Sequence, residues 1–475
     1  MLKVDAGCWM SDAGEKHLPT SSIRHPTSTL MISRAIEQVE RLALRMEAEK
    51  ANRLLGALPS SAIEAMQRAR FRRVLRLAAR SSAFYREQFR KRGIAVDKIK
   101  HPSELGDFFT TGEDLRAHGA EHFLTGHADT AFETTGTTSP VPKRAYFSQK
   151  EINEIGRSSA LGLHFLGLHR TDRVMSAFDC SFWVSPVVVR SAFQYINCFH
   201  VEAGKIEPLE FYERALVYLP NVIFGEPSWI VRLSEIADGR GTWPVKFLFA
   251  GGENITETAR AAVERVWRAP LYLNYGQTEA FGAIGVECKQ KDGYHRNDLN
   301  FIFEVVEDDE EGNGELVYTT LTRNVMPLIR YRSTDITRVI DEPCACGLFA
   351  KRIGKIRARS DEMVVCGMGN VGPWVFAEVL GEMLPAGADW QAVIKSEGYR
   401  DLIEIHLELP DRGQQQECES KIRQNLRERF PDFWRNYEMR LYDLKVIRHP
   451  QGSLRTGRKL RRVIDERQML VHSVI

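Results

Sequence analysis

The sequence predicts an α/β protein with a large N-terminal domain, in which β-sheets are flanked by helices, and a small C-terminal α+β domain. From about residue 130 onward, short apolar runs alternate with helical patterns. Residues 222–224 (VIF) and 247–250 (FLFA) are typical of buried parallel strands, and helical patterns follow at residues 229–237 and 257–267. This alternation indicates βαβ organisation. Beyond Arg359 the pattern changes, and about 110 residues fit a separate α+β module.

The N-terminal elements can be predicted in order. Residues 1–28 are polar and aperiodic, and we expect a flexible tail there. Residues 29–93 carry apolar side chains at helical spacing. Pro59 and Ser60 open the second of these helices, and Ser61 and Glu64 have the spacing of a capping box. Residues 316–319 and 335–340 predict a more antiparallel region, so the N-terminal domain is expected to span residues 29–358.

The C-terminal domain is expected to span residues 361–475. Strands are predicted at residues 363–366, 392–394 and 402–409, and helices at residues 374–383 and 416–429. The stretch from Gly367 to Gly372 (GMGNVG) matches G-x-G-x-x-G, as in dinucleotide-binding turns. It lies late in the chain, and no acidic residue closes a second strand at the required distance. We therefore interpret it as a glycine turn between strand and helix, and we expect no nicotinamide or flavin binding.

Composition excludes several functional classes. The 475 residues include 65 Lys and Arg against 63 Asp and Glu. This balance argues against a protein that binds nucleic acid or a membrane surface. No apolar run approaches the length of a membrane span, and residues 1–8 lack the pattern of a secretory signal. The eight Cys are scattered apart from Cys344 and Cys346, as expected for a cytoplasmic chain with free thiols or a metal site.

A loop rich in threonine is the most informative local feature. Residues 134–143 read TTGTTSPVPK, and Arg144 follows Lys143. Glycine lets the backbone approach a phosphate, amides and hydroxyls donate hydrogen bonds to its oxygens, and basic side chains supply charge. Runs of Thr, Ser, Gly and Pro also form plain surface loops. The composition alone therefore leaves two interpretations, a polyphosphate-binding loop and an ordinary one.

Four later segments favour the first interpretation when they are taken together. They are residues 250–253 (AGGE), 274–279 (NYGQTE), 330–335 (RYRSTD) and 455–465 (RTGRKLRRVID). In this order, after the threonine-rich loop, they resemble the adenylate-forming superfamily of acyl-CoA synthetases, adenylation domains and luciferases. Residues 82–87 (SAFYRE) are similar to the phenylacetate–CoA ligase-like branch. The resemblance covers about residues 70–467.

The resemblance implies an enzyme, an acid–thiol ligase with a mobile C-terminal lid. A small carboxylic acid attacks the α-phosphate of ATP, which gives an acyl-adenylate and pyrophosphate. The lid then rotates, and a thiol, of coenzyme A or of carrier-protein phosphopantetheine, takes the acyl group. Mg²⁺ is implied as the cation that accompanies ATP, because it prefers carboxylate and phosphate oxygens. The oligomeric state stays open, a homodimer included.

The resemblance also assigns residues to these tasks. The β- and γ-phosphates are expected to be bound by Thr134, Thr135, Gly136, Thr137, Thr138 and Lys143. The adenine pocket is expected to be lined by Gly251, Gly252 and Glu253, with Tyr275 packed against the base. Glu279 is expected to hold Mg²⁺, Thr278 to contact the α-phosphate, Asp335 to accept from both ribose hydroxyls and Arg359 to contact the nucleotide. Lys459 is expected to stabilise the adenylation transition state, and Asp361 to be the hinge.

A metal site is a further expectation. Cys344 and Cys346 form a C-x-C turn, and upstream lie Cys288 and His295. Three thiolates and an imidazole are a ligand set for tetrahedral Zn²⁺, although the spacing is not that of common zinc fingers. The resemblance adds that some members of the branch carry a structural zinc here. The alternative is a set of ordinary cysteines and a surface histidine.

The chain departs from the family pattern at the acceptor side. Met368 falls where a glycine normally lets the pantetheine arm pass, and its side chain would narrow that channel between Gly367 and Gly369. This leaves coenzyme A, a carrier protein, an amine or another nitrogen nucleophile, or no second step as alternatives. A non-catalytic relative that binds nucleotide or an aryl ligand is a rival of another class. Retention of Glu279, Asp335 and Lys459 argues against it.

Aromatic residues suggest the class of acid. The acid pocket is expected to include residues 178–183 (FDCSFW) and residues near Trp229, Phe281 and Gly282. Because aromatic rings stack on planar rings at close range, an aromatic or heteroaromatic acid is the natural prediction. The alternative for each side chain is an ordinary place in the core.

Overall fold

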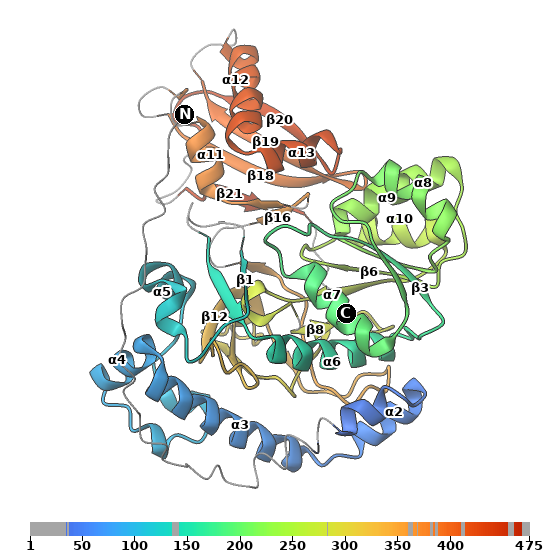
Figure 1. Ribbon diagram of the computed structural model, residues 1–475. Coiled ribbons are helices and arrows are strands. Elements are labelled where there is room, and N and C mark those ends of the chain that lie inside the picture. Colours follow the sequence, from blue (N-terminus) through green and yellow to red (C-terminus); the bar gives the residue numbers. More distant parts are fainter. Residues whose placement is uncertain are drawn as a thin grey trace, which may run out of the picture.

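The protein consists of a large N-terminal domain and a smaller C-terminal domain. In Figure 1 the large domain runs from blue through green to yellow, and the C-terminal domain is orange to red. The computed structural model describes residues 35, 38–134, 142–282, 284–359, 364–367, 369–380, 383–384, 388–409, 414–454 and 460–467. In this part of the chain, no helix combines the length and the apolar character that crossing a membrane requires. The α/β fold class predicted from the sequence is confirmed.

Helices form the N-terminal side of the large domain (Figure 1). They are α2 (Ala48–Gly56), α3 (Ser60–Ser81), α4 (Ala83–Lys91) and α5 (Gly112–His118), with short 3₁₀ turns at Val96–Lys98, Pro102–Leu105 and Ala120–Phe123. The predicted start of a helix at Ser60 is confirmed. The predicted capping box is wrong, because Pro59 is the N-cap and no side chain caps the helix. Ser82, in contrast, caps α4 by accepting from the Tyr85 amide.

A nine-stranded sheet is the centre of the large domain, in the order β13-β14-β9-β8-β7-β6-β5-β3-β4. Its parallel half comprises β4 (Phe199–Glu202), β3 (Arg173–Ala177), β5 (Val222–Gly225), β6 (Phe247–Gly251) and β7 (Leu271–Tyr275). Its antiparallel half comprises β8 (Gly285–Val286), β9 (Tyr294–Arg296), β14 (Arg352–Ile353) and β13 (Val339–Ile340). The predicted buried parallel strands at residues 222–224 and 247–250 are therefore confirmed.

Helices cover both faces of the parallel half. They are α6 (Gln149–Phe165), α7 (Ser185–Ile196), α8 (Pro208–Tyr218), α9 (Pro227–Arg240) and α10 (Glu257–Trp267). Successive side chains of a strand point to opposite faces. Ile223 accordingly packs in the cluster that contains α8, α9 and α10 residues, whereas Val222 and Phe224 pack with residues of α6 and α7. Burial on both faces explains why these strands are continuous apolar runs.

Two further β-structures flank this sheet. A four-stranded antiparallel sheet comprises β10 (Phe301–Val306), β11 (Gly314–Thr320), β12 (Tyr331–Thr337) and β15 (Ala358–Arg359). It confirms the antiparallel region expected there. The strands β1 (Thr130–Glu133) and β2 (Arg144–Phe147) pair as an antiparallel hairpin. The threonine-rich loop is therefore the connection at the end of this hairpin.

The C-terminal domain has a sheet of its own, in the order β20-β19-β18-β21, and a separate hairpin. Its elements are β16 (Val364–Cys366), β17 (Gly369–Val371), α11 (Pro373–Leu380), β18 (Trp390–Glu397), β19 (Arg400–Glu408), α12 (Gln414–Arg429), α13 (Pro431–Glu438), β20 (Tyr442–His449) and β21 (Val463–Asp465). The glycine stretch at residues 367–372 turns between β16 and β17, since Cys366 pairs with Gly369. A second strand, and not a helix, follows that turn.

Ion pairs join the C-terminal domain to the large domain. Arg400 of β19 donates to Glu235 of α9 with an N–O distance of 2.8 Å. The Nζ of Lys205 lies 3.8 Å from a carboxylate oxygen of Asp432 in α13. The C-terminal domain therefore packs over the edge of the parallel sheet at which β5 and β6 end.

Candidate active site

A cavity of about 650 Å³ lies at the carboxyl ends of the parallel strands. Open α/β sheets bind ligands at this edge. Among the predicted residues, the cavity walls include Thr134, Lys143, Gly251, Gly252, Thr278, Glu279, His295 and Arg359. Val365 of β16 also lines it, so both domains contribute to its walls.

The base of the threonine-rich loop is held closed by two hydrogen bonds. The Thr134 amide donates to the Lys143 carbonyl at 2.9 Å, and the Lys143 amide donates to the Thr134 hydroxyl at 3.2 Å. Thr135, Gly136, Thr137 and Thr138 lie outside the described residues. Thr134 and Lys143, at the two ends of the loop, both line the cavity.

Glu279 is the acidic centre of the cavity. It lies in a 3₁₀ turn (Thr278–Ala280) after β7 and is 2 % exposed. Lys143 Nζ lies 2.5 Å from its Oε1, and the Tyr331 hydroxyl donates to the same oxygen at 2.7 Å. Burial would raise the pKa of Glu279, but Lys143 and Tyr331 outweigh it and lower the pKa below its usual value. The carboxylate is thus ionised at neutral pH, as a cation ligand must be.

Asp335 is the centre of a second network. Arg359 donates to its Oδ1 at 2.9 Å, and the Tyr275 hydroxyl and the Gln277 amide donate to its Oδ2 at 2.6 and 2.7 Å. Tyr318 in turn donates to Gln277 at 3.1 Å. Burial and the adjacent Asp335 raise the pKa of Tyr275 well above its usual value, so its hydroxyl stays protonated and can donate.

Three residues of this site carry roles that sequence reasoning did not assign. Gln277 lies inside the motif at residues 274–279 and Tyr331 inside the motif at residues 330–335, but neither was given a task. Tyr318 and Tyr331 lie on strands β11 and β12, where they look like core residues. The pairing of Tyr318 with Tyr331 across those strands places both beside the acidic groups. The sequence feature that could have indicated a role for Tyr318 and Tyr331 is their polar hydroxyl group, on strands in or beside the motif that contains Asp335.

The glycine-rich turn after β6 lines the cavity, whereas its glutamate has a structural contact. A Cβ on Gly251 would lie 3.3 Å from the Asn274 carbonyl, and Gly252 has a φ of +95°, which favours glycine. Glu253 accepts from the Ser228 amide at 2.9 Å, at the start of α9. Burial and the charge of Glu253 raise the pKa of the neighbouring Glu226 well above its usual value.

The expected acid pocket is present in part. Phe178, Trp183 and Gly282 line the cavity. Trp229 and Phe281 do not line it, because both side chains are 0 % exposed and pack in the core. Tyr275, expected against the adenine, is also buried and is not among the lining residues, although its neighbours Asn274 and Gly276 are. The apolar character of a side chain in the sequence therefore does not show whether the residue lines the cavity or packs in the core.

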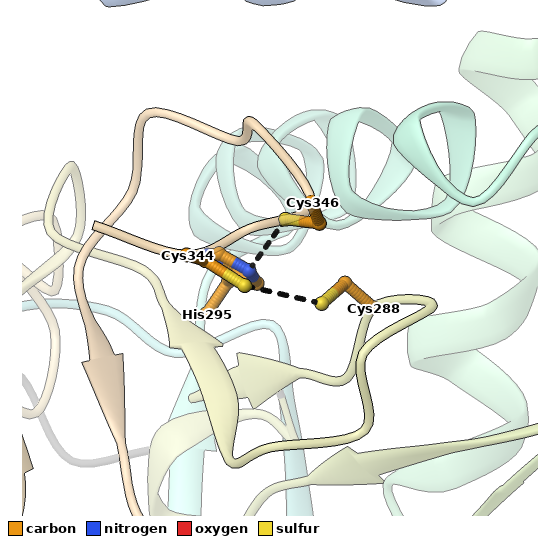
Figure 2. Close-up of side chains that lie close together, drawn as sticks. All are labelled: Cys288, His295, Cys344 and Cys346. Atoms are coloured by element: carbon orange, nitrogen blue, oxygen red, sulfur yellow. Dashed lines mark hydrogen bonds between the residues drawn. The ribbon is translucent and has the colours of Figure 1, made fainter. Parts of the chain in front are cut away.

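The four predicted metal ligands meet in one cluster (Figure 2). Cys288 and His295 lie on or beside strands β8 and β9, and the turn with Cys344 and Cys346 precedes β14, which pairs with β9. Their ligand atoms all lie within 4.8 Å of one another. The Cys288 and Cys344 sulfurs are 3.7 Å apart, and Cys346 Sγ lies 3.2 Å from His295 Nε2.

The cluster could hold a metal ion, and its one sulfur–sulfur distance suits a tetrahedral site. A tetrahedral ion about 2.3 Å from each sulfur would hold two sulfurs about 3.8 Å apart. His295 Nδ1 lies 2.7 Å from the Ala350 carbonyl, which can only accept a hydrogen bond. Nδ1 therefore carries the proton, and the Nε2 lone pair faces the sulfurs, as in metal-binding histidines.

Three more of the predicted residues fall outside the described part of the chain. They are Lys459, Asp361, expected as the hinge, and Met368. Their roles stay predictions from the sequence.

Comparisons with known proteins identify proteins that are similar to this chain. No model of a known protein family matches the chain. Phenylacetate-coenzyme A ligase of Pseudomonas putida is 24 % identical over 381 residues, which cover 75 % of this chain and 84 % of that protein. Phenylacetate-coenzyme A ligase of Thermus thermophilus is 26 % identical over 382 residues, with the same coverage.

Solved structures show the same fold. A 2-hydroxyisobutyryl-CoA ligase in complex with 2-HIB-AMP and CoA, in its thioester-forming state, matches with a TM-score of 0.71 and 21 % identity, over 86 % of this chain and 91 % of that chain. An open conformation of that ligase matches with a TM-score of 0.60 and 20 % identity, over 86 % of this chain and 93 % of that chain.

The fold is therefore that of the 2-hydroxyisobutyryl-CoA ligase, with a large domain and a smaller C-terminal domain. In sequence, the chain is similar to the phenylacetate-coenzyme A ligases. The resemblance predicted from the motifs is confirmed.

Proposed function

We propose that this protein activates a carboxylic acid, of aromatic or other apolar type, with ATP and transfers the acyl group to a thiol. The observation that carries the proposal is the meeting of three groups in one cavity. These are Thr134 and Lys143 at the two ends of the threonine-rich loop, the ionised Glu279 paired with Lys143, and Gln277 and Arg359, which both donate to Asp335. The curated relatives, which are named phenylacetate-coenzyme A ligases, support it.

The chemistry follows from these positions. A carboxylate oxygen of the acid attacks the α-phosphorus of ATP, and the bond to pyrophosphate breaks. The hairpin loop and Lys143 bind the β- and γ-phosphates, and Asp335 binds the ribose, in exchange for its present partners. Glu279 would hold Mg²⁺, which neutralises charge on the phosphate oxygens. The acceptor thiolate then attacks the acyl carbonyl, and AMP leaves with the bonding electron pair.

The acceptor is the second part of the proposal. A thiol, either coenzyme A or a carrier-protein phosphopantetheine, is favoured by the names of the curated relatives, which are coenzyme A ligases. Incubation of the protein with ATP, Mg²⁺, an accepted acid and either coenzyme A or a primary amine tests this. A thioester as the product supports the proposal, and an amide with no thioester refutes it.

An amine acceptor is the second candidate, and a group of acidic residues favours it. Glu226, Glu253 and Asp179 lie close together where β3, β5 and β6 end, with Lys205 as a basic neighbour. An excess of carboxylates at the ends of these strands would attract a cation more than a polyanion such as coenzyme A. The same product analysis decides between the two.

Lys459→Ala should lower adenylation by orders of magnitude while ATP binding persists. The resemblance assigns the transition-state charge to Lys459, and a lost electrostatic contact of this kind acts on the rate more than on binding. Acid-dependent pyrophosphate release and ATP titration measure the two effects. Arg458→Ala is the matched control and should retain adenylation. Unchanged adenylation in Lys459→Ala would refute the assignment of this role to Lys459.

We further propose that Cys288, His295, Cys344 and Cys346 hold a structural zinc ion. The closed four-ligand set leaves no open position for substrate, so the ion would fasten the Cys344–Cys346 turn to strands β8 and β9.

Removal of one ligand should release the metal and destabilise the protein. Elemental analysis should find about one zinc ion per chain in the wild type, and much less in Cys346→Ser. Thermal unfolding of that variant should occur at a lower temperature, because binding of the ion is coupled to folding. Cys198→Ser, which changes a half-buried cysteine outside the cluster, should keep the metal. A metal-free wild type after growth with zinc would contradict the proposal.

We also propose a cytoplasmic location, and the lack of disulfide bonds among the described cysteines supports it, because reduced cysteines persist there.

A further inference from the structure

The helical N-terminal side of the large domain carries a local excess of positive charge. Residues 60–100 contain twelve Lys and Arg against three Asp and Glu, whereas the whole chain has 65 against 63. Figure 1 shows α3 and α4, which make up most of this segment, on the outside of the large domain and away from the C-terminal domain. The apolar side of α3 is buried in the core through residues such as Phe71 and Leu75. The charged side of the helix therefore faces outward.

Exposed arginines follow one another along α3 and α4. Arg72, Arg76 and Arg80 lie four residues apart on α3, about 6 Å along the axis of the helix. Arg86 and Arg90 continue this spacing on α4, and Arg86 donates to the Arg80 carbonyl at 3.3 Å. Only Arg76 among these five forms an ion pair with a described residue. Because like charges at this spacing repel one another within a helix, these five residues, which we call the basic face, favour an anionic partner.

A turn of opposite charge lies on the same domain. Residues 307–311 (EDDEE), which we call the acidic turn, follow β10 in its connection to β11, and all five side chains are exposed. Three of them have side-chain partners within the molecule. Asp308 and Glu310, in contrast, form no ion pair with the residues that the structure describes. Each copy of the chain thus carries unpaired cations and unpaired anions on exposed surfaces.

The acidic turn and the basic face lie on one side of the molecule, joined by the segment that follows α4. Arg332 pairs with Glu307 of the acidic turn at 2.9 Å and lies 5.5 Å from the ring centre of Phe109. Arg92, just beyond the end of α4, lies 5.6 Å from the ring centre of the neighbouring Phe108. A surface that carries both charges next to each other is self-complementary under a two-fold axis, since each acidic turn can face the basic face of the partner.

We propose that this side of the large domain is the interface of a homodimer, in which the acidic turn of each copy lies against the basic face of the other. Asp308 and Glu310 then neutralise arginines that have no counter-charge in a single copy. A second copy is the occupant because the complementary charge is present on this chain. The near balance of charge over the whole chain also argues against nucleic acid or a membrane surface. The inference concerns neither the cavity nor the reaction, so it does not depend on the proposed function.

The oligomeric state as a function of salt is the first test. Sedimentation velocity of the wild type should show a dimer at about 0.05 M salt, and the dissociation constant of the dimer should rise at least about tenfold at about 0.5 M salt. The physical reason is that salt screens the attraction between exposed charges. A wild type that is monomeric at low salt, or a dimer that salt does not weaken, would overturn the inference.

An exchange of charges makes the test specific to these two surfaces. One variant combines Arg72→Glu, Arg80→Glu and Arg90→Glu, and the other combines Asp308→Lys and Glu310→Lys. Each should be monomeric at low salt, because like charges then face each other across the interface. An equimolar mixture should form a mixed dimer, since the two variants are complementary in both halves of a two-fold interface. Recovery of the dimer would also show that both variants are folded.

The matched control reverses three exposed arginines on other elements, Arg170→Glu with Arg265→Glu and Arg427→Glu. It should keep the wild-type dimer, because it changes the net charge as much as the triple arginine variant but leaves the basic face intact. A monomeric control, or a mixture of the two interface variants that stays monomeric, would overturn the inference.

Discussion

Glu279→Gln is expected to lower acid-dependent pyrophosphate release by at least about a hundredfold. The substitution keeps the shape of the side chain but removes the charge that faces Lys143 at 2.5 Å. It also removes the anionic oxygen that would hold Mg²⁺ against the phosphates. Lys143 would then be attracted less firmly to this end of the cavity, so positioning of the β- and γ-phosphates should suffer as well.

The control for this prediction is a Glu→Gln substitution at a surface position outside the cavity, which removes the same charge. Glu210 of α8 pairs with Arg214 at the surface, and Glu210→Gln should leave release within about twofold, because exposed pairs contribute little. Release by Glu279→Gln within about threefold of the wild type, in a protein with an unchanged unfolding temperature, would contradict the assigned role.

Arg260→Met is expected to cost about 3–5 kcal/mol of the free energy of unfolding. Arg260 of α10 is 1 % exposed and makes a bidentate pair with Glu287, which is 0 % exposed, with both N–O distances at 3.0 Å. Without Arg260, the Glu287 carboxylate would stay buried with the Leu273 amide at 2.8 Å and Lys355 at 3.5 Å as its remaining partners. Removal of one partner leaves a buried charge uncompensated, which is the costly case.

The free energies of unfolding of the wild type and the variant are measured by urea denaturation. They are compared with the same dependence of free energy on urea concentration for both proteins. Arg214→Met is the matched control, since it removes the arginine of an exposed pair, and it should cost no more than about 1 kcal/mol. Equal costs for the two substitutions would show that the Arg260–Glu287 pair does not fasten α10 to the strand end that leads to Cys288.

Much of the fold could be predicted because its parallel strands are buried on both faces. Residues 222–224 and 247–250 are continuous apolar runs for that reason, and a helical pattern follows each. The metal cluster was also predictable, although its members are far apart in the sequence. Cysteine and histidine can be recognised in a sequence as potential metal ligands from their residue type alone. The pairing of β14 with β9 then brings these residues together.

Other features depend on tertiary contacts that no local pattern contains. Trp229 and Phe281 have the same apolar character as Phe178 and Trp183, yet only the latter two line the cavity. Tyr318 and Tyr331 are strand residues whose hydroxyls acquire a role only because β11 and β12 lie beside residues 277–279. Likewise, the spacing of Ser61 and Glu64 fits a capping box, but Pro59 already begins the helix.

The most direct test of the central claim is pyrophosphate release with ATP and Mg²⁺ across a panel of aryl and alkyl acids, each with and without coenzyme A. We predict release that requires an acid, and an acyl-thioester when coenzyme A or a phosphopantetheine carrier is supplied. A protein that binds ATP but releases no pyrophosphate with any acid of the panel would contradict the account and indicate a nucleotide-binding relative without catalytic activity.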